Sequence, residues 1–470
     1  MHFFISGCRR LRRLVSEFSR DEDGAIVAYV LLMFLMMVVA AGMAVDFTRQ
    51  ESARADLQNA LDRGTLAAAD FSQTVSDKQL VVRDYMRSSA IHSPDLALNV
   101  VETSGVNFSR VTADARYQIP TFFLKIIGIN TLTVAAQGAA EQQKRKVEIS
   151  MILDVSGSMG WSAGHSSGSK LDVLKVAAHE FIDTLITTDT MADTSISIVP
   201  YSENVRPSAN LAAQFNLNTH HNYHYCFAFD HGALNDPTDL GDFSSMGISR
   251  ATQYQQAQRI KSGWGSRYRC PRAGNEILPM SNSVSALHNR IASLRTEGYT
   301  ATYDGLKWGA ALLDPDNNPV VQGLVGAGDV DAGFSDRPLA YDTTGAMKII
   351  VIMTDGANTR QYRIRPSVYA NRSPDYWNSN APRSRYLERL VDNDIGAKGD
   401  RLMHTICDAA KARNIVIYTI GFELSSDPAA AAALSQCASA TDNHFLVEGV
   451  QISSAFQTIA ANIQKLRLVQ

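Results

Sequence analysis

Oxygen-bearing side chains follow two apolar stretches of the sequence. Asp154 ends the run "EISMILD" and Asp355 ends the run "KIIVIMTD", while Ser156 and Ser158 come directly after the first acid in the small-residue turn "SGSMG". Ligands of an open parallel sheet collect at the carboxyl ends of its strands, so both acids are expected on one rim. Carboxylates and hydroxyls are hard donors, which suit Mg²⁺, with Mn²⁺ or Ca²⁺ as alternatives, and do not suit soft metals.

The elements that must position these residues alternate between strand and helix from about residue 145 onward. This alternation predicts an α/β fold with a doubly wound, mostly parallel sheet flanked by helices. Apolar spacing predicts strands at 146–155, 195–202, 347–355 and 415–422, and helices at 171–186, 283–295, 401–413 and 454–468. Residues 203–283 and 357–397 interrupt the rhythm, and we expect both to be surface insertions.

The N-terminal part of the chain predicts a membrane anchor. Residues 24–45 carry no charge, and at about 1.5 Å per residue they span roughly 33 Å, enough for a bilayer core. The tail at 1–23 contains five arginines, which predicts a cytoplasmic N-terminus and an extracytoplasmic remainder. A signal peptide cleaved before Val45 is the alternative, although the apolar run exceeds the usual length of such a peptide.

Two further segments lie between the anchor and the α/β domain at 145–470. Apolar residues three, four or seven apart predict an amphipathic helix over 46–75. From about 96 to 147 the sequence changes to an alternating, β-rich pattern, so we expect residues 76–144 to form a small β-containing stalk region.

The cysteines favour disulfides outside the cytoplasm. Cys8 lies in the predicted cytoplasmic tail, and the four others form an even set: Cys226, Cys270, Cys407 and Cys437. Four cysteines allow three pairings. We favour Cys226–Cys270 and Cys407–Cys437 because each pair lies within one segment, but the sequence alone leaves the pairing open.

Three motifs carry a resemblance to a known family. "DVSGS" resembles the D-x-S-x-S signature of von Willebrand factor type A domains, "GYTATYDGL" resembles their threonine loop, and "IVIMTDG" resembles their second acidic strand. The motifs occur in the family's order, and the resemblance covers about 145–470. It implies a metal-ion-dependent adhesion site, where an acidic group of a partner protein completes the shell of the ion.

The resemblance also implies a role for each residue of that site. Ser156, Ser158 and Thr300 would contact the ion directly, whereas Asp154 and Asp355 would hold it mainly through water. Thr302 is the competing threonine. Thr300 is preferred because the family's Gly-Gly-Thr aligns with "GYT" at 298–300, where a tyrosine replaces the second glycine.

A second resemblance concerns the N-terminal end. The stretch from "DEDGAIVAYV" to "LDRGTLAAA" resembles the membrane segment of Tad-type pilus assembly proteins, and a following von Willebrand A domain is similar to the TadG-type member. Related pseudopilins have a glycine followed five positions later by glutamate for peptidase cleavage. Here Gly24 is followed by Tyr29, so a retained anchor is expected. The C-terminal half resembles the TadG type too, which supports pairing Cys407 with Cys437.

Other chemistry receives weaker support from the sequence. The histidines and cysteine of "THHNYHYC" (His220, His221, His224 and Cys226) match no common zinc spacing. The stretch "GHSSGSK" lacks phosphate-loop spacing and is interpreted as a lead into the helix from Leu171. A haloacid-dehalogenase-type phosphatase would need an acid where Ser156 stands, and no nucleophile with a positioned base is recognisable, so we expect no enzyme.

The sequence patterns predict a single-pass membrane protein, and the two resemblances imply an inner-membrane protein of pilus assembly or adherence. Its extracytoplasmic domain is expected to bind an acidic group of a protein partner through Mg²⁺, next to other pilus-assembly components. The net charge of −3 gives no reason to expect nucleic acid. A secreted or surface-exposed adhesin using the same metal site, and a minor pilin-like structural component, are the alternatives.

Overall fold

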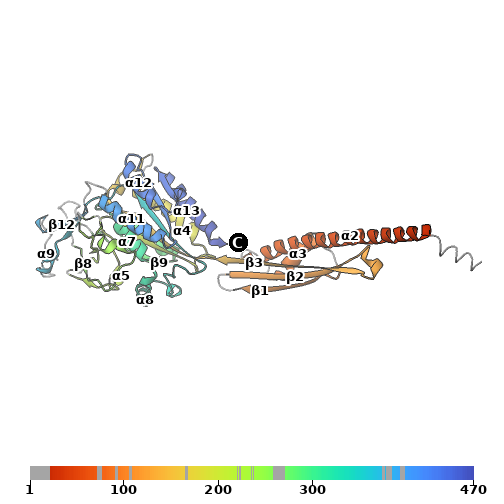
Figure 1. Ribbon diagram of the computed structural model, residues 1–470. Helices are drawn as coiled ribbons and strands as arrows, with labels where there is room; N and C mark the ends of the chain where they lie inside the picture. The colour runs from red at the N-terminus through yellow and green to blue at the C-terminus, as the bar shows by residue number, and fades with distance from the viewer. Residues whose placement is uncertain are drawn as a thin grey trace, which may run out of the picture. The chain divides into compact units, whose positions relative to one another are not determined.

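A computed structural model describes most of the chain beyond residue 21 (Figure 1). The described residues are 22–70, 77–89, 94–104, 108–164, 168–219, 221, 224–233, 236, 238–257, 270–372, 376, 384–391 and 397–469. They form two compact units, which divide between Gln143 and Lys144. Cys8 and His220 fall outside the described residues.

The first unit opens with one long helix. Helix α2 runs unbroken over Glu22–Ala69, so the expected membrane segment and the amphipathic segment share one helix. Among the described helices, it is the one long and apolar enough to cross a membrane, and side chains of its apolar half, such as Leu31 and Phe34, are exposed. The helix ends at Ala69, earlier than the expected limit of 75; residues 71–76 lie outside the described part.

A helix and an antiparallel sheet complete the first unit. They are α3 (Lys78–Ser88), β1 (Ala97–Ser104), β2 (Phe108–Pro120) and β3 (Thr131–Lys144), with β2 paired to both neighbours. Side chains alternate along a strand, so Val111 and Ala113 of β2 reach one core with Leu57 and Leu61 of α2. The β2–β3 hairpin, with the short helix η1 (Leu124–Ile127) in its loop, runs alongside α2 (Figure 1).

The second unit is built on a six-stranded sheet with the order β14-β13-β10-β4-β5-β9. Its pairs are parallel except for β5 with β9. The apolar residues of the central strands are buried on both faces, as expected for a covered parallel sheet. The strands are β4 (Lys146–Asp154), β5 (Thr194–Tyr201), β9 (Leu278–Ser281), β10 (Ala346–Thr354), β13 (Val416–Phe422) and β14 (His444–Val447).

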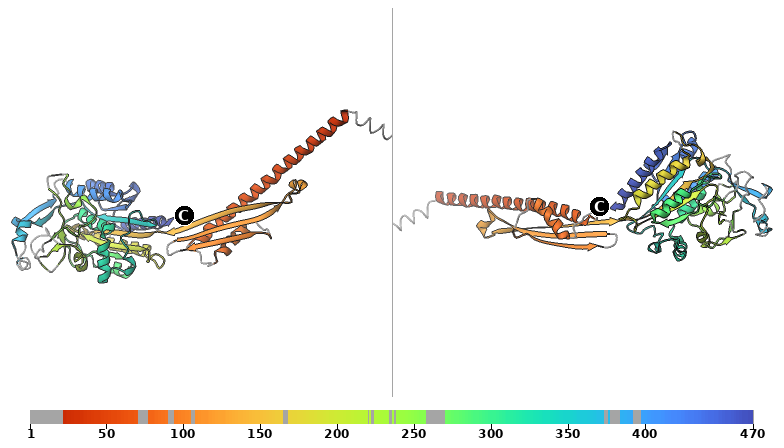
Figure 2. Two further views of the ribbon diagram at one scale, coloured as in Figure 1. Left: turned by 60° about the horizontal axis from the view of Figure 1, so that its bottom comes forward. Right: turned by 180° about the vertical axis from the view of Figure 1, so that it is seen from behind.

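Helices cover both faces of this sheet (Figure 2). Met151 and Val351 point to one face and share a core with α4 (Lys170–Leu185), α6 (Val284–Ser293) and α13 (Gln451–Arg467). Ile152 and Ile350 point to the other face and share a core with α7 (Thr302–Ala311), α11 (Ala397–Lys411) and α12 (Pro428–Cys437). The mixed α/β architecture expected from the sequence is confirmed, as are all the strands and helices predicted from apolar spacing.

The segments at 203–283 and 357–397, expected as insertions, contain short elements and buried side chains. Phe227 and Phe229, from the 203–283 segment, are buried against Trp308 of α7, and Tyr254 stacks on Phe227. Strand β9, at the end of that segment, joins the main sheet. The 357–397 segment forms a hairpin with a small core of its own around Tyr369. These aromatic side chains bury too much apolar surface to remain in water.

The shorter elements of the second unit lie mainly in these segments and in the connections. They are η2 (Gly157–Gly160), α5 (Ala209–Ala212), β6 (Leu217–Asn218), β7 (Phe227–Ala228), η3 (Gly241–Ser244), β8 (Tyr254–Gln256), η4 (Pro315–Asn317), α8 (Asn318–Ala327), η5 (Ala332–Phe334), β11 (Gln361–Ile364), α9 (Pro366–Ala370), η6 (Ser384–Tyr386), β12 (Leu387–Val391), η8 (Thr441–Asn443) and β15 (Leu468–Val469).

Two disulfides link the four cysteines of the described chain as favoured from the sequence. Cys226 is bonded to Cys270, and Cys407 of α11 is bonded to Cys437 of α12. The first bridge links two positions of the 203–283 segment, and the second joins two helices on one face of the sheet.

Candidate functional site

The two predicted acids lie at neighbouring strand ends. Strands β4 and β10 pair in parallel at the centre of the sheet. The chain continues from β4 to β5 on one side and from β10 to β13 on the other, so a topological switch point separates them. Asp154 is the last residue of β4, and Asp355 follows the last residue of β10. The sheet therefore delivers both carboxyl groups to one rim.

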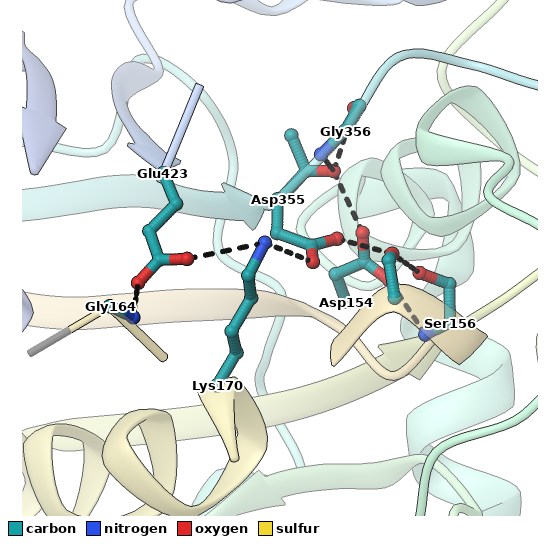
Figure 3. Close-up of polar contacts among 9 residues, drawn as sticks. Asp154, Ser156, Gly164, Lys170, Asp355, Gly356 and Glu423 are labelled. Carbon is teal, nitrogen blue, oxygen red and sulfur yellow. Dashed lines mark hydrogen bonds and ion pairs between the residues drawn. The ribbon is translucent and has the colours of Figure 1, made fainter. Parts of the chain in front are cut away.

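Hydrogen bonds join four of the predicted residues into one chain (Figure 3). The Asp154 Oδ1 atom accepts from the Ser156 backbone N–H at 2.7 Å. The Ser156 and Ser158 hydroxyl oxygens are 3.0 Å apart, and the Ser158 hydroxyl donates to Asp355 Oδ1 at 2.6 Å. The turn of η2 places the two serines on the same side, so the structure brings Asp154, Ser156, Ser158 and Asp355 together.

Asp154 lies in an environment that disfavours its charge. The residue is fully buried, and burial, followed by the nearby negative charge of Asp355, raises its pKa to about 7. Hydrogen bonds only partly oppose this; one comes from the Thr354 hydroxyl, which donates to Asp154 Oδ2 at 2.7 Å. A cation between the two acids would relieve the cost of ionising them both.

A lysine that sequence reasoning missed reaches the same site. Lys170, the first residue of α4, places its ammonium 3.0 Å from Asp355 Oδ2 and 3.5 Å from Glu423 Oε2 (Figure 3). Glu423 also accepts from the Gly164 backbone N–H at 2.6 Å. The lysine side chain is 9% exposed, so the ion pairs are poorly screened.

Of Lys170 and Glu423, which the sequence analysis did not identify, only Lys170 had a signal in the sequence. Lys170 stands in "GHSSGSK", which was interpreted only as a lead into a helix starting at Leu171; that helix starts at Lys170, capped by Ser169 with Asp172. A charged residue next to a strong N-cap at a sheet rim was the available signal. Glu423 follows β13 with a φ of 56°, which no sequence pattern indicates for glutamate.

The predicted threonine loop adjoins the serine turn. The Gly157 N–H donates to the Gly298 carbonyl at 3.0 Å, and the Thr300 N–H donates to the Thr359 hydroxyl at 2.9 Å. Within the described residues, the Thr300 hydroxyl is not part of the hydrogen-bonded chain of the acids and serines. Thr302, the competing threonine, is less suitable because its hydroxyl lies 3.2 Å from the buried Tyr201 hydroxyl.

The donor set fits a hard divalent cation. Asp154, Ser156, Ser158 and Asp355 offer only oxygen atoms, and the two acids are buried at one rim. Oxygen-only sites of this kind suit Mg²⁺ or Ca²⁺. Lys170 supplies a positive charge to Asp355, so an incoming ion would share that carboxylate with an ammonium group.

The structure does not support a zinc site at the histidines and cysteine of "THHNYHYC", because Cys226 is not a free thiol. A ring nitrogen of His224 and the Sγ atoms of Cys226 and Cys270 lie within 4.8 Å of one another, but the two sulfurs form a disulfide. A bridged sulfur cannot act as a thiolate ligand. The His221 and His224 rings instead contact each other edge to face, and His221 Nε2 lies 2.7 Å from the Ala257 carbonyl.

Comparison with a protein-family model identifies the N-terminal segment. Residues 24–70 match the family described as putative Flp pilus-assembly TadE/G-like. The expected Tad-type segment is therefore confirmed, and it coincides with helix α2. No curated protein matches the chain.

Solved structures give only distant similarities. The von Willebrand factor domain of the type V pili tip protein Mfa5 from Porphyromonas gingivalis is 13% identical with a TM-score of 0.37, over 70% of this chain and 98% of that one. The adhesive tip pilin GBS104 from Group B Streptococcus agalactiae is 12% identical with a TM-score of 0.36, over 67% and 99%. Scores this low support no conclusion on fold or function.

Proposed function

We propose that the second unit is a von Willebrand factor type A domain, with its doubly wound fold, and that it binds a protein partner through a divalent cation. The observation that carries the proposal is the meeting of two buried acids and two serine hydroxyls at the switch point of the sheet. The antiparallel edge strand, the helices on both faces and the order of the three motifs support the fold assignment.

The proposed site assigns a role to each residue. Asp154, Ser156, Ser158 and Asp355 would hold the ion, and Thr300 would join them from the adjacent loop. Mg²⁺ is the preferred ion, with Mn²⁺ or Ca²⁺ as alternatives, because the donors are all oxygen. When bound, the ion supplies a positive charge that attracts an acidic side chain of the partner. We propose a binding role without catalysis.

The first unit would anchor this domain in the inner membrane. The Tad-type match over residues 24–70 and the exposed apolar half of α2 support a single-pass anchor in a pilus-assembly or adherence protein. The arginine-rich tail favours a cytoplasmic N-terminus, and the two disulfides favour an oxidising compartment for the second unit. Other pilus-assembly components are the proposed partners.

Retention of the anchor, rather than cleavage before Val45, agrees with the shape of α2. The helix continues without a break through Ala44 and Val45. Gly42 and Asp46, on either side of that position, are both buried against the β2–β3 hairpin. A peptidase would meet a packed helix here instead of an extended segment.

Calorimetric titration of the full-length protein in detergent with Mg²⁺ or Mn²⁺ tests the metal site. We expect saturable binding of one ion, and a loss of affinity of roughly 10–100-fold in Asp154→Asn and in Ser158→Ala, as removal of metal-site hydrogen bonds usually produces. Asp336→Asn is the matched control, because this surface acid pairs with Lys146 at 3.1 Å. Circular dichroism verifies that each variant is folded. Equal affinity in all variants would disprove the site.

A further inference from the structure

The tip of the β2–β3 hairpin carries apolar side chains that face solvent. Phe122 is 63% exposed, Ile126 is 67% exposed and Ile127 is 54% exposed, within the stretch "TFFLKIIGIN". Single exposed apolar residues are common on proteins, but a contiguous group of large ones marks a contact surface. This surface, which we name the hairpin tip (residues 121–130), therefore needs a partner.

The hairpin tip is fixed firmly to helix α2. The buried Asp46 carboxylate accepts three backbone N–H bonds, from Phe122 at 2.9 Å and from Phe123 and Leu124 at 2.8 Å each. The Arg49 guanidinium lies 4.1 Å from the centre of the Phe122 ring. Because its backbone is held by a side chain of α2, the tip cannot move independently of that helix.

The point of attachment is the end of the apolar run in α2. A Cβ atom on Gly42 would lie 2.3 Å from the Phe123 ring, so the glycine allows the tip to contact the last turn of residues 24–45. Val45 and Phe47 of α2 are 48% and 51% exposed at the same level. The apolar surface of the tip is thus continuous with that of the proposed membrane segment.

We infer that the hairpin tip is a second membrane contact, which enters the headgroup and upper acyl region of the bilayer where α2 emerges. The inference rests on the membrane anchoring in the proposed function. A lipid surface is the occupant because the level of the tip along the helix is set by Asp46, one residue beyond the apolar run. Lys125 is exposed in the same loop and can pair with lipid phosphate.

Such a contact would have a mechanical consequence. A lone helix can tilt and rotate in a bilayer, and flanking anchors restrict both movements. A second insertion point that is held rigidly to the helix would fix the rotation of α2 about its axis. The sheet of the first unit would then leave the membrane in one direction.

Depth-dependent fluorescence quenching tests the inference on the full-length protein in phosphatidylcholine and phosphatidylglycerol vesicles. In a Cys8→Ser background, single cysteines carry an environment-sensitive dye at Ile127, at Phe34 in the apolar run, or at Val101 on β1, which is 49% exposed. Lipids with nitroxides at shallow or deep positions act as quenchers. We expect the label at Ile127 to lie roughly 5–10 Å below the headgroups, as interfacial segments do.

The three labels separate the possible outcomes. The inference is supported if the shallow quencher lowers the fluorescence of the label at position 127 and the deep quencher lowers that of the label at position 34. The fluorescence of the label at position 101 should not change with either quencher. Quenching at 34 without quenching at 127 overturns it and leaves the anchor intact, whereas no quenching at 34 contradicts the anchor itself. A blue-shifted label at 127 that lipid quenchers do not reach would show a second copy covering the tip, and would also overturn the inference.

Discussion

Lys170 is the residue that distinguishes this rim from one made of oxygen donors alone. Its ammonium balances the buried Asp355 and reaches Glu423 as well. Removing one partner of a buried ion pair is costly because the other charge loses its compensation. A divalent ion at Asp355 would provide the same compensation, so the proposed ion and the lysine would stabilise the same carboxylate.

Lys170→Met should therefore couple stability to metal. Without divalent ions, we expect the free energy of unfolding to fall by about 3–5 kcal/mol, the usual cost of breaking a buried pair. Saturating Mg²⁺ should restore most of the loss, and the affinity for Mg²⁺ should rise relative to the wild type. Urea unfolding with and without Mg²⁺ measures both effects.

The control lies on the same helix. Lys175 of α4 donates to the Ala292 carbonyl at 3.1 Å and touches no acid of the rim, so Lys175→Met should respond to Mg²⁺ as the wild type does. If Mg²⁺ fails to rescue Lys170→Met beyond this control, the ion and the lysine do not share Asp355.

The residues of the site were predictable to different degrees. Asp154 and Asp355 were predictable because an acid at the end of an apolar strand needs only local pattern and the rule for parallel sheets. Lys170 and Thr354 were not, because their roles depend on which elements pack together in three dimensions. Glu423 depends on a left-handed backbone conformation that glutamate seldom adopts.

At the scale of elements, α7 shows how the sheet and the threonine loop are held together. The helix begins at Thr302, within the threonine-loop motif at 298–306, and packs on β4 and β5 through two glycines. A Cβ on Gly305 would lie 2.7 Å from the Tyr201 ring, and a Cβ on Gly309 would lie 2.5 Å from Ile152 Cδ1. Close contact of helix and sheet thus requires glycine at both positions.

Gly309→Ala should destabilise the second unit by about 1–3 kcal/mol, the usual cost of overpacking a core. Adding Ile152→Val removes the clashing Cδ1 atom and should recover part of that loss. Thermal or urea unfolding of the single and double variants measures the change. The prediction concerns packing, because alanine is otherwise the better helix former.

Gly326→Ala provides the comparison. This glycine lies in the last turn of α8, and an added Cβ would have no atom within 4 Å apart from its chain neighbours and the backbone of its own helix, so the variant should be as stable as the wild type or gain up to about 1 kcal/mol. If Gly309→Ala and Gly326→Ala change the stability equally, the close contact of α7 with the sheet does not require glycine at position 309.

Sequence patterns predicted the elements with clear apolar spacing but gave no information on how the irregular segments pack. A regular helix shows its buried face by a period of 3.6 residues, as α4 does, and strands buried on both faces show continuous apolar runs, as β4 and β10 do. The 203–283 segment has no regular period, yet Phe227 and Phe229 pack on α7. Its polar composition gives no sign of this packing, which depends on a few aromatic side chains.

At the scale of the whole molecule, the chain combines an anchoring unit with a proposed binding unit. The first unit carries the Tad-type helix and the hairpin tip, and the second carries the rim with Asp154 and Asp355. Each unit has its own hydrophobic core, so each can be altered separately. A variant at the rim should leave membrane attachment unchanged.

Affinity capture of the full-length protein from its own membranes tests the central claim most directly. The wild type and Asp154→Ala are each captured with Mg²⁺ and with a chelator, and the accompanying proteins are compared. We predict that at least one pilus-assembly component accompanies only the wild type, only with Mg²⁺, and is released when the chelator is added. Capture of the same proteins by the variant, or by the wild type in the chelator, would contradict metal-dependent partner binding.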